Sequence, residues 1–203
     1  MRRRGWTVAV LATLSLLLPT MAAPSAAAAD GKYALGDSVM LGARTALKQE
    51  GFRVDAAESR QAYAGPAMLR RMGDRLPANV VVHLGTNGSY PLSSCTALVK
   101  AAGPQRRVFL VTVHVPRSWE RPNNRVIREC ARAFPEGRVT VIDWNEAVSA
   151  HPGWLYGDGI HLKPSGGAAF ARLISRSVEE AAQKAHAAAL AQAAGSGHAA
   201  LEP

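Results

Sequence analysis

The feature that most constrains the fold of this 203-residue chain is a regular alternation of short apolar runs with helical patterns. The apolar runs are rich in Val, Ile and Leu and show little polar alternation, which is typical of strands covered on both faces. Strands that alternate with helices favour right-handed crossovers and a three-layer α/β/α domain, here with a five-stranded parallel sheet. The predicted strands are residues 32–36, 52–57, 79–85, 107–115 and 138–144, and the predicted helices are 38–50, 66–76, 92–103, 123–134 and 164 to about 184.

Polar residues gather where these predicted strands end. In an open parallel sheet, ligands bind beyond the carboxyl ends of the strands. We therefore expect the polar segments to converge on one edge of the sheet and to form the rim of an active site. These segments are residues 36–38, 58–61, 85–88, 114–117 and 143–145, together with the loop 156–162 before the last helix.

Ser38 is the candidate nucleophile of this rim. A serine hydroxyl reacts only when a base takes its proton, and the base is usually a histidine oriented by an acid. Asp158 and His161 lie three residues apart in one loop, so the carboxylate can reach Nδ1 and leave Nε2 free for Ser38. A serine before a helix is also a common N-cap, and the stretch around Ser38 alone leaves both interpretations open. His114 is a second candidate for the base, whereas His83, inside an apolar strand, is expected to be a core histidine.

An oxyanion hole is the second requirement, because attack on an ester produces a negatively charged tetrahedral intermediate. The candidate donors are the backbone N–H of Ser38 at the start of a helix, the side-chain amide of Asn87 and a backbone N–H near Ser59. The Gly85-Thr86-Asn87-Gly88 stretch is also compatible with an ordinary turn, since Asn and Gly tolerate positive φ.

Three motifs in this order resemble the SGNH (GDSL-like) hydrolase superfamily: Gly36-Asp37-Ser38, Gly85-Thr86-Asn87 and Asp158-Gly159-Ile160-His161-Leu162. Residues 33–176 more narrowly resemble the extracytoplasmic SGNH domain of peptidoglycan O-acetyltransferases. That resemblance is carried by Val54-Asp55-Ala56, Arg60-Gln61, residues 111–120, Asn124 and Ile142-Asp143-Trp144. It implies a flavodoxin-like three-layer fold, no metal and no cofactor. It also implies that Ser38 is the nucleophile, His161 the base and Asp158 its partner, with Ser38, Ser59 and Asn87 in the oxyanion hole.

The chain departs from the family pattern in two places. Ser59 stands where the family usually has a glycine; the backbone N–H survives this change, but a positive φ there would strain a serine. The multi-span acyltransferase domain of the two-domain enzymes has no counterpart in this sequence, so transfer of an acyl group is expected to need a separate membrane partner. The Gly36-Asp37-Ser38-Val39-Met40 stretch also differs from the Gly-x-Ser-x-Gly elbow of α/β-hydrolases, which disfavours that fold.

Residues 1–29 have the layout of a secretory signal peptide, with arginines at positions 2–4, an apolar run from about Trp6 to Pro19 and a cleavage region of small residues. We expect cleavage after Ala29 and a secreted, extracytoplasmic protein without stable membrane insertion; an uncleaved anchor is the alternative. The rest of the chain is expected to hold one SGNH hydrolase-like domain over residues 30–184. An Ala-rich tail over residues 185–203 is expected to be partly helical or disordered, with fraying at 195–197.

The formal net charge of +9 includes the three arginines of the leader. A basic secreted protein is attracted to polyanions such as acidic cell-wall polymers. Zinc-finger spacing, RNA-binding signatures and long basic runs do not occur in the sequence, which argues against nucleic acid as a partner. Cys95 and Cys130 can form a disulfide after export or remain two buried thiols.

The sequence therefore predicts a secreted serine esterase that cleaves small acyl esters, with O-acetyl groups on cell-wall or other polysaccharide as the expected substrate. One alternative is an O-acetyltransferase that passes the acyl group to a glycan hydroxyl with the help of a membrane partner. A further alternative is a non-catalytic cell-wall-binding module on a hydrolase scaffold. Trp119, Trp154 and Tyr156 lie in loops near the rim, where they would either stack on sugar rings or pack the loops.

Overall fold

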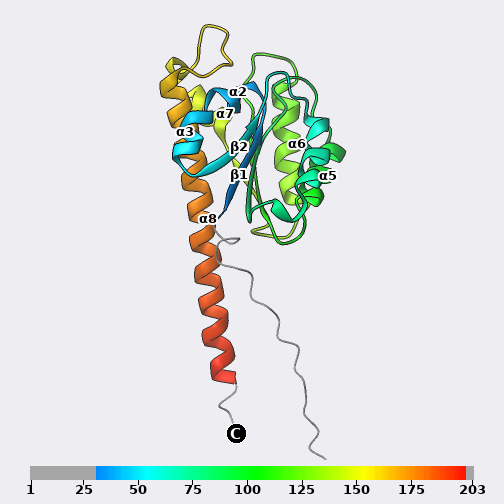
Figure 1. Ribbon diagram of the computed structural model, residues 1–203, viewed down its shortest axis with the longest axis vertical. Coiled ribbons are helices and arrows are strands. Elements are labelled where there is room, and N and C mark those ends of the chain that lie inside the picture. Colours follow the sequence, from blue (N-terminus) through cyan, green and yellow to red (C-terminus); the bar gives the residue numbers. More distant parts are fainter. Residues whose placement is uncertain (1–30, 200–203) are drawn as a thin grey trace, which may run out of the picture.

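A five-stranded parallel sheet forms the centre of the molecule, with the strand order β2-β1-β3-β4-β5 (Figure 1). The computed structural model describes residues 31–199. This strand order is the flavodoxin-like one, in which the order reverses beside β1. The predicted fold class, a three-layer α/β/α domain with a five-stranded parallel sheet, is confirmed. The strands are β1 (Lys32–Gly36), β2 (Phe52–Ala56), β3 (Asn79–His83), β4 (Arg107–Val111) and β5 (Val139–Ile142).

Helices cover both faces of the sheet, and each face has its own apolar core. Side chains alternate along a strand, so Val81 of β3 faces one core while its neighbours Val80 and Val82 face the other. Phe170 lies in the first core and Ile127 in the second, each fully buried against the sheet. The first layer holds α2 (Ser38–Gly42), α3 (Arg44–Gln49), α7 (Trp144–Ser149) and α8 (Pro164–Ala199), and the second holds α4 (Gly65–Met72), α5 (Leu92–Ala101) and α6 (Glu120–Arg132).

The fourth strand was predicted over residues 107–115, but it ends at Val111. The neighbouring strand β5 ends at Ile142, so the sheet offers no further partner. From there the chain pairs with a side chain instead, because Asn124 accepts a hydrogen bond from the N–H of Val113 and donates one to its carbonyl, each at 2.8 Å. His114 therefore lies in a loop and not in a strand.

Several other boundaries differ from the prediction by a few residues. The helix predicted over 38–50 is divided at Ala43 into α2 and α3, and α6 begins at Glu120, three residues early. The short helix α7 was not predicted, because its first residues continue the apolar run of β5. Residues 31–199 also contain three 3₁₀ turns: η1 (Ala62–Ala64), η2 (Gly73–Arg75) and η3 (Pro152–Trp154).

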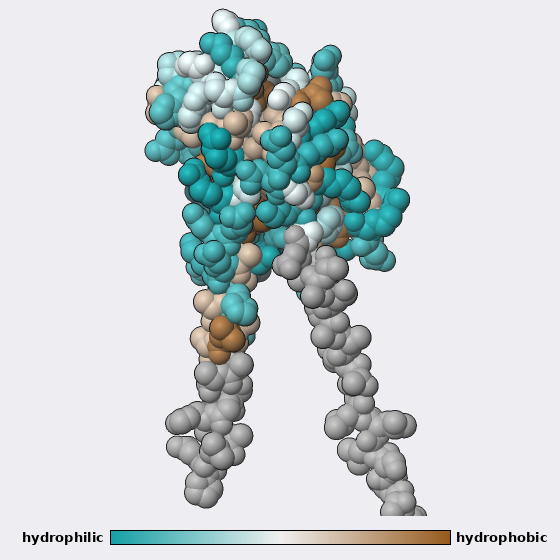
Figure 2. Space-filling model, turned by 60° about the vertical axis from the view of Figure 1, so that its left-hand side comes forward, coloured by the Kyte–Doolittle hydropathy of each residue, from teal (hydrophilic) through white to brown (hydrophobic). Residues whose placement is uncertain are grey.

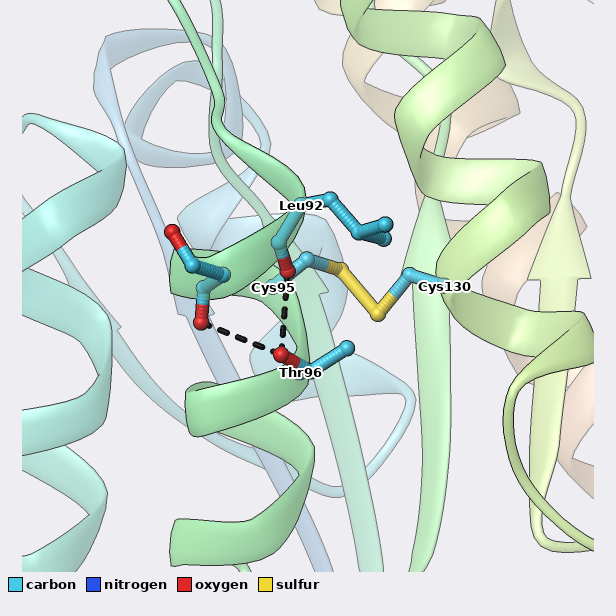
Figure 3. Close-up of a disulfide and its surroundings, with 5 residues drawn as sticks. Leu92, Cys95, Thr96 and Cys130 are labelled. Carbon is cyan, nitrogen blue, oxygen red and sulfur yellow. Dashed lines mark hydrogen bonds between the residues drawn. A yellow bond between two sulfur atoms is a disulfide. The ribbon is translucent and has the colours of Figure 1, made fainter.

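Cys95 of α5 and Cys130 of α6 form a disulfide between two neighbouring helices of the second layer (Figure 3). Their Cα atoms are 6.2 Å apart, within the usual range for a disulfide. Of the two possibilities that the sequence left open, the structure has the disulfide. Both half-cystines are fully buried in the second apolar core.

The last helix, α8, is longer than predicted and continues to Ala199, beyond the lower edge of the sheet (Figure 1). It passes through residues 195–197, where fraying was expected. Within residues 31–199, no helix combines the length and the apolar character needed to cross a membrane. The leader expected at residues 1–29 lies outside the described residues.

Candidate active site

Ser38 is the first residue of α2 and follows the end of β1 by two positions. The N-cap is Asp37, whose side chain accepts a hydrogen bond from the N–H of Val39 at 3.1 Å. The interpretation of Ser38 as the cap is therefore wrong, and its hydroxyl is free for another role. The tight turn depends on Gly36, because a Cβ at this position would lie 2.4 Å from the Cβ of Met40.

The structure brings Ser38, His161 and Asp158 together in one hydrogen-bonded relay. Nε2 of His161 lies 3.1 Å from Oγ of Ser38, and Nδ1 of His161 lies 2.7 Å from Oδ2 of Asp158. The carboxylate accepts a hydrogen bond from Nδ1–H, which leaves the Nε2 lone pair directed at the serine hydroxyl. This is the geometry that a general base and its orienting acid require.

The loop between η3 and α8 holds Asp158 and His161 in this position. An antiparallel bridge between Leu155 and Leu162 closes the loop, and the N–H of Tyr156 donates to the carbonyl of His161 at 2.9 Å. Oδ1 of Asp158 also accepts hydrogen bonds from the N–H groups of Ile160 at 2.9 Å and His161 at 3.0 Å. Both carboxylate oxygens are thus fixed before any substrate arrives.

These hydrogen bonds keep Asp158 ionised. The side-chain hydrogen bond from His161 is the main cause that lowers the pKa of Asp158 to about 2; the backbone donors of His161 and Ile160 and the charge of His161 assist, and partial burial opposes them. The side chains of Asp158 and His161 are 45% and 47% exposed. A bulky substrate can therefore reach the relay from solvent.

The proposed oxyanion donors lie in the same pocket as Ser38. Ser59 and Asn87 both line this pocket, which has a volume of about 780 Å³. Ser59 has a φ of 54° and is the only residue other than glycine with a positive φ in the described part of the chain. The strain that the sequence analysis made conditional on the backbone is thus present at Ser59.

Arg60 fixes the loop that carries Ser59, and the sequence analysis gave it no role in the site. Its guanidinium donates hydrogen bonds to the carbonyls of Gly36 at 3.0 Å and Asp55 at 2.6 Å, and to the Asp55 carboxylate at 2.7 Å. Its own carbonyl accepts a hydrogen bond from the Asn87 amide at 3.3 Å. Arg60 therefore links the ends of β1 and β2 to Asn87. Only its place in a family motif marked it in the sequence.

An aromatic wall borders the pocket on the side of α6. Nε1 of Trp119 donates a hydrogen bond to the carbonyl of Thr86 at 3.2 Å, which holds the indole beside the residues of the proposed hole. Tyr156 is half exposed at another side of the same pocket. The full lining is Ser38, Leu41, Gly42, Glu58, Ser59, Thr86, Asn87, Val115, Arg117, Trp119, Tyr156, Ile160, His161 and Leu162.

Several residues that were expected at the rim lie elsewhere. His114 does not line the pocket, and its Nδ1 is 3.3 Å from the Asn145 amide, so it is not placed to act on Ser38. Asp143 caps α7, where it accepts hydrogen bonds from the N–H of Glu146 and the hydroxyl of Thr112. Trp154 stacks on Trp144 with ring centroids 5.9 Å apart, so it packs its loop and does not face the pocket.

Within residues 31–199, no three His, Cys, Asp or Glu side chains are grouped to hold a metal ion.

Comparison with known proteins identifies relatives on both sequence and structure. No family model matches the chain. The chain is 33% identical over 150 residues to the O-acetyltransferase OatA of Staphylococcus aureus (strain NCTC 8325 / PS 47), an alignment that covers 71% of this chain and 24% of that protein. The chain thus spans about a quarter of the length of the curated relatives it matches.

Solved structures extend the similarity to the fold. The C-terminal catalytic domain of the peptidoglycan O-acetyltransferase OatA of Streptococcus pneumoniae, solved with a methylsulfonyl adduct, superimposes with a TM-score of 0.64. It is 26% identical, and the match covers 78% of this chain and 95% of that domain. A family 3 carbohydrate esterase of Clostridium thermocellum shares the fold at 16% identity, with a TM-score of 0.57 over 72% of this chain and 98% of that one.

Proposed function

Because this chain belongs to the SGNH (GDSL-like) hydrolase superfamily, we propose that it is a serine esterase that removes small acyl groups, O-acetyl above all, from cell-wall or other polysaccharide. The observation that carries the proposal is the relay from Ser38 through His161 to Asp158, with its distances of 3.1 and 2.7 Å, in a pocket that also holds Asn87 and Ser59.

The reaction begins when His161 takes the hydroxyl proton of Ser38 and Oγ attacks the ester carbonyl. The negative charge that develops on the carbonyl oxygen is stabilised by the N–H groups of Ser38 and Ser59 and by the Asn87 amide. When the tetrahedral intermediate collapses, the C–O bond breaks and the sugar hydroxyl leaves with the proton from His161. Water, deprotonated by His161, then attacks the acyl-enzyme and releases the carboxylic acid.

The pocket suits an acylated sugar better than a long lipid chain. Its volume of about 780 Å³ is in the range of small-ligand sites, and its lining includes the polar residues Glu58, Arg117 and Asn87. Trp119 and Tyr156 supply flat faces on which sugar rings can stack. The half-exposed relay allows a polymer to approach from outside.

Transfer to a glycan hydroxyl is the second candidate function, and the similarity to OatA proteins favours it. Transfer and hydrolysis share the acyl-enzyme and differ only in which hydroxyl attacks it. An open pocket admits a sugar as well as water. In this case a membrane partner would deliver the acyl donor.

The test compares the wild-type chain with Ser38→Ala and with Ser118→Ala, an exposed serine close to the pocket that serves as a matched control. Hydrolysis of an activated acetyl ester is followed with and without a chitooligosaccharide as acceptor, and the products are identified by mass spectrometry. We expect turnover in the wild type and in Ser118→Ala, and its loss in Ser38→Ala. Free acetate alone supports the esterase, and acetylated sugar supports the transferase.

Turnover that survives Ser38→Ala, or no turnover on any acyl ester, would contradict both enzymatic functions. If the wild-type chain has no turnover but is retained on cell-wall material, the non-catalytic binding module is favoured.

A further inference from the structure

A buried pair of ionisable residues, Asp37 and His83, lies directly behind the proposed site and takes no part in the reaction written above. Both side chains are 0% exposed. Asp37 lies between β1 and α2, and His83 is the last residue of β3, paired in register with Gly36 of the neighbouring strand. Nδ1 of His83 lies 3.2 Å from Oδ1 of Asp37, so the imidazole N–H donates to the carboxylate.

The Asp37 carboxylate connects two parts of the site. Its Oδ1 accepts the N–H of Val39, which follows the nucleophile in α2, at 3.1 Å. Its Oδ2 accepts the N–H of Thr86, which precedes Asn87, at 3.4 Å. One side chain therefore sets the distance between the helix that carries Ser38 and the loop that carries the Asn87 donor.

His83 is arranged to serve this carboxylate alone. Its Nε2 has no hydrogen-bond partner among the residues that the structure describes, and the ring packs edge-on against Phe170 of α8 with centroids 5.4 Å apart. The apolar packing fixes the plane of the imidazole. The single polar contact of the ring is then the one to Asp37.

Asp37 would be costly to bury without such a partner, because an isolated carboxylate loses its hydration. Burial acts to raise the pKa of Asp37, but the charge and hydrogen bond of His83 and the donors of Thr86 and Val39 outweigh it and lower the pKa below the usual value for Asp. The side chain is therefore an anion, which accepts hydrogen bonds at both oxygens.

We propose that His83 and Asp37 are positioning residues of the active site: His83 holds the Asp37 carboxylate, and the carboxylate locks the Ser38 helix to the Thr86–Asn87 loop at the separation that the oxyanion needs. The inference rests on the proposed function. Neither residue touches the substrate, so their loss is expected to change the rate of acyl transfer and not the binding of the ester.

The experiment compares His83→Ala with His83→Asn in the full chain. The side-chain NH₂ of asparagine can occupy the place of the Nδ1–H, so this variant keeps the hydrogen bond without the ring. Thr112→Val is the matched control. Thr112 directly follows β4 and is as fully buried as His83, but its hydroxyl contacts Asp143 and not the site. Hydrolysis of an activated acetyl ester gives kcat and KM, and thermal melts report how much of each variant is folded.

We expect His83→Ala to lower kcat about 10- to 100-fold, in line with a small misplacement of reacting groups, with KM changed less than about 2-fold. His83→Asn is expected to recover most of kcat, and Thr112→Val to lower the melting temperature without lowering kcat. Equal kcat in His83→Ala and wild type, or no recovery in His83→Asn, would overturn the proposal. Should His83→Ala not fold, the isosteric Asp37→Asn replaces it, with the same fall in kcat expected.

A second readout separates this inference from the proposed function. Exchange of the backbone amide hydrogen of Thr86, measured by NMR, is expected to be faster in Asp37→Asn than in wild type. The carboxylate offers one oxygen to the N–H of Val39 and one to the N–H of Thr86, whereas the asparagine side chain has a single oxygen. This measurement needs no activity. If the wild type has no Ser38-dependent turnover, the proposed function fails, and unchanged Thr86 exchange in Asp37→Asn would overturn the lock independently.

Discussion

Ser59 is held in a left-handed backbone conformation, with a φ of 54°, and the proposed function uses only its backbone N–H. A side chain there costs free energy, because Cβ crowds the backbone at positive φ. We predict that Ser59→Gly raises the free energy of unfolding by about 1 kcal/mol, the usual strain of one such residue. Activity should stay close to that of wild type, since the N–H remains. Urea unfolding and ester hydrolysis measure the two quantities.

Ser59→Ala is the control for the side chain, because it keeps the Cβ and removes the hydroxyl. We expect it to retain both the strain and the activity. A large loss of activity in Ser59→Ala would show that the hydroxyl itself contributes to catalysis. A Ser59→Gly variant that is less stable than wild type would show that the positive φ of Ser59 does not destabilise the fold.

The low pKa of Asp158 gives a prediction about pH. A carboxyl with a pKa of about 2 is ionised at pH 4 and above, so protonation of Asp158 is expected to contribute nothing to the pH dependence of kcat/KM above pH 4. The folded-state pKa of Asp158 is below the unfolded value of about 3.9. Its ionised form therefore stabilises the fold above that value, and the contribution is lost as the pH falls towards 2.

The stabilisation is small because Asp158 is half exposed. The melting temperatures of wild type and Asp158→Asn are expected to differ most above pH 5 and to converge at pH 2. A difference that grows on acidification would contradict the assigned ionisation state.

Some functional residues could be predicted from the sequence and others could not, for a physical reason. Asp158 and His161 lie within one short loop, so their spacing alone limits where the carboxylate can reach. Arg60 and His83 act through contacts with residues more than 20 positions away in the chain. No local pattern records such contacts, and the sequence around His83 is that of an ordinary core strand because its side chain is fully buried.

At the scale of elements, the site depends on how closely η3 approaches the start of α8. The carbonyl of Trp154 accepts a hydrogen bond from Lys163 at 2.9 Å and lies against Gly166, where a Cβ would be 2.3 Å from that oxygen. We predict that Gly166→Ala costs about 1–3 kcal/mol of stability, since the clash with backbone outweighs the gain in helix propensity. It should also lower kcat, because the displaced loop carries His161. Urea unfolding and ester hydrolysis test both effects.

Gly153→Ala provides the comparison within η3, because a Cβ at this position meets no atom within 4 Å. It is expected to change stability by less than about 1 kcal/mol, as most exposed substitutions do, and to leave kcat unchanged. Equal effects of the two substitutions would mean that the approach of η3 to α8 does not position the loop.

Element boundaries were harder to predict than element types. The short apolar runs and the helical patterns between them predicted five strands, and each of them is present in the structure. The end of β4 at Val111 depends on where β5 stops and on Asn124, whose side chain replaces a neighbouring strand. Such ends are set by partners distant in sequence, whereas the apolar run continues past them.

At the scale of the whole molecule, the packed part of α8 belongs to the domain, whereas its projecting part is exposed to solvent. The body of the molecule is mostly hydrophilic in the view of Figure 2, with apolar surface only in small patches. α8 packs on the first core through residues such as Phe170, Ile174 and Val178, and Ala181 is the last of its residues in that cluster. An ion pair at 3.5 Å between Glu179 and Lys32 lies near the same end.

Between residues 183 and 192, α8 makes no contribution to the core. Residues 183–192 are exposed, including Leu190 at 58%. We predict that a chain ending at Lys184 keeps the kcat of the full chain and a melting temperature within about 2 °C, since surface changes away from the core cost less than about 0.5 kcal/mol. Circular dichroism should show less helix in proportion to the residues removed. A larger fall in melting temperature would place the boundary of the domain beyond residue 184. It would mean that the exposed turns of α8 stabilise the fold through contacts of their own, such as contacts between copies of the chain.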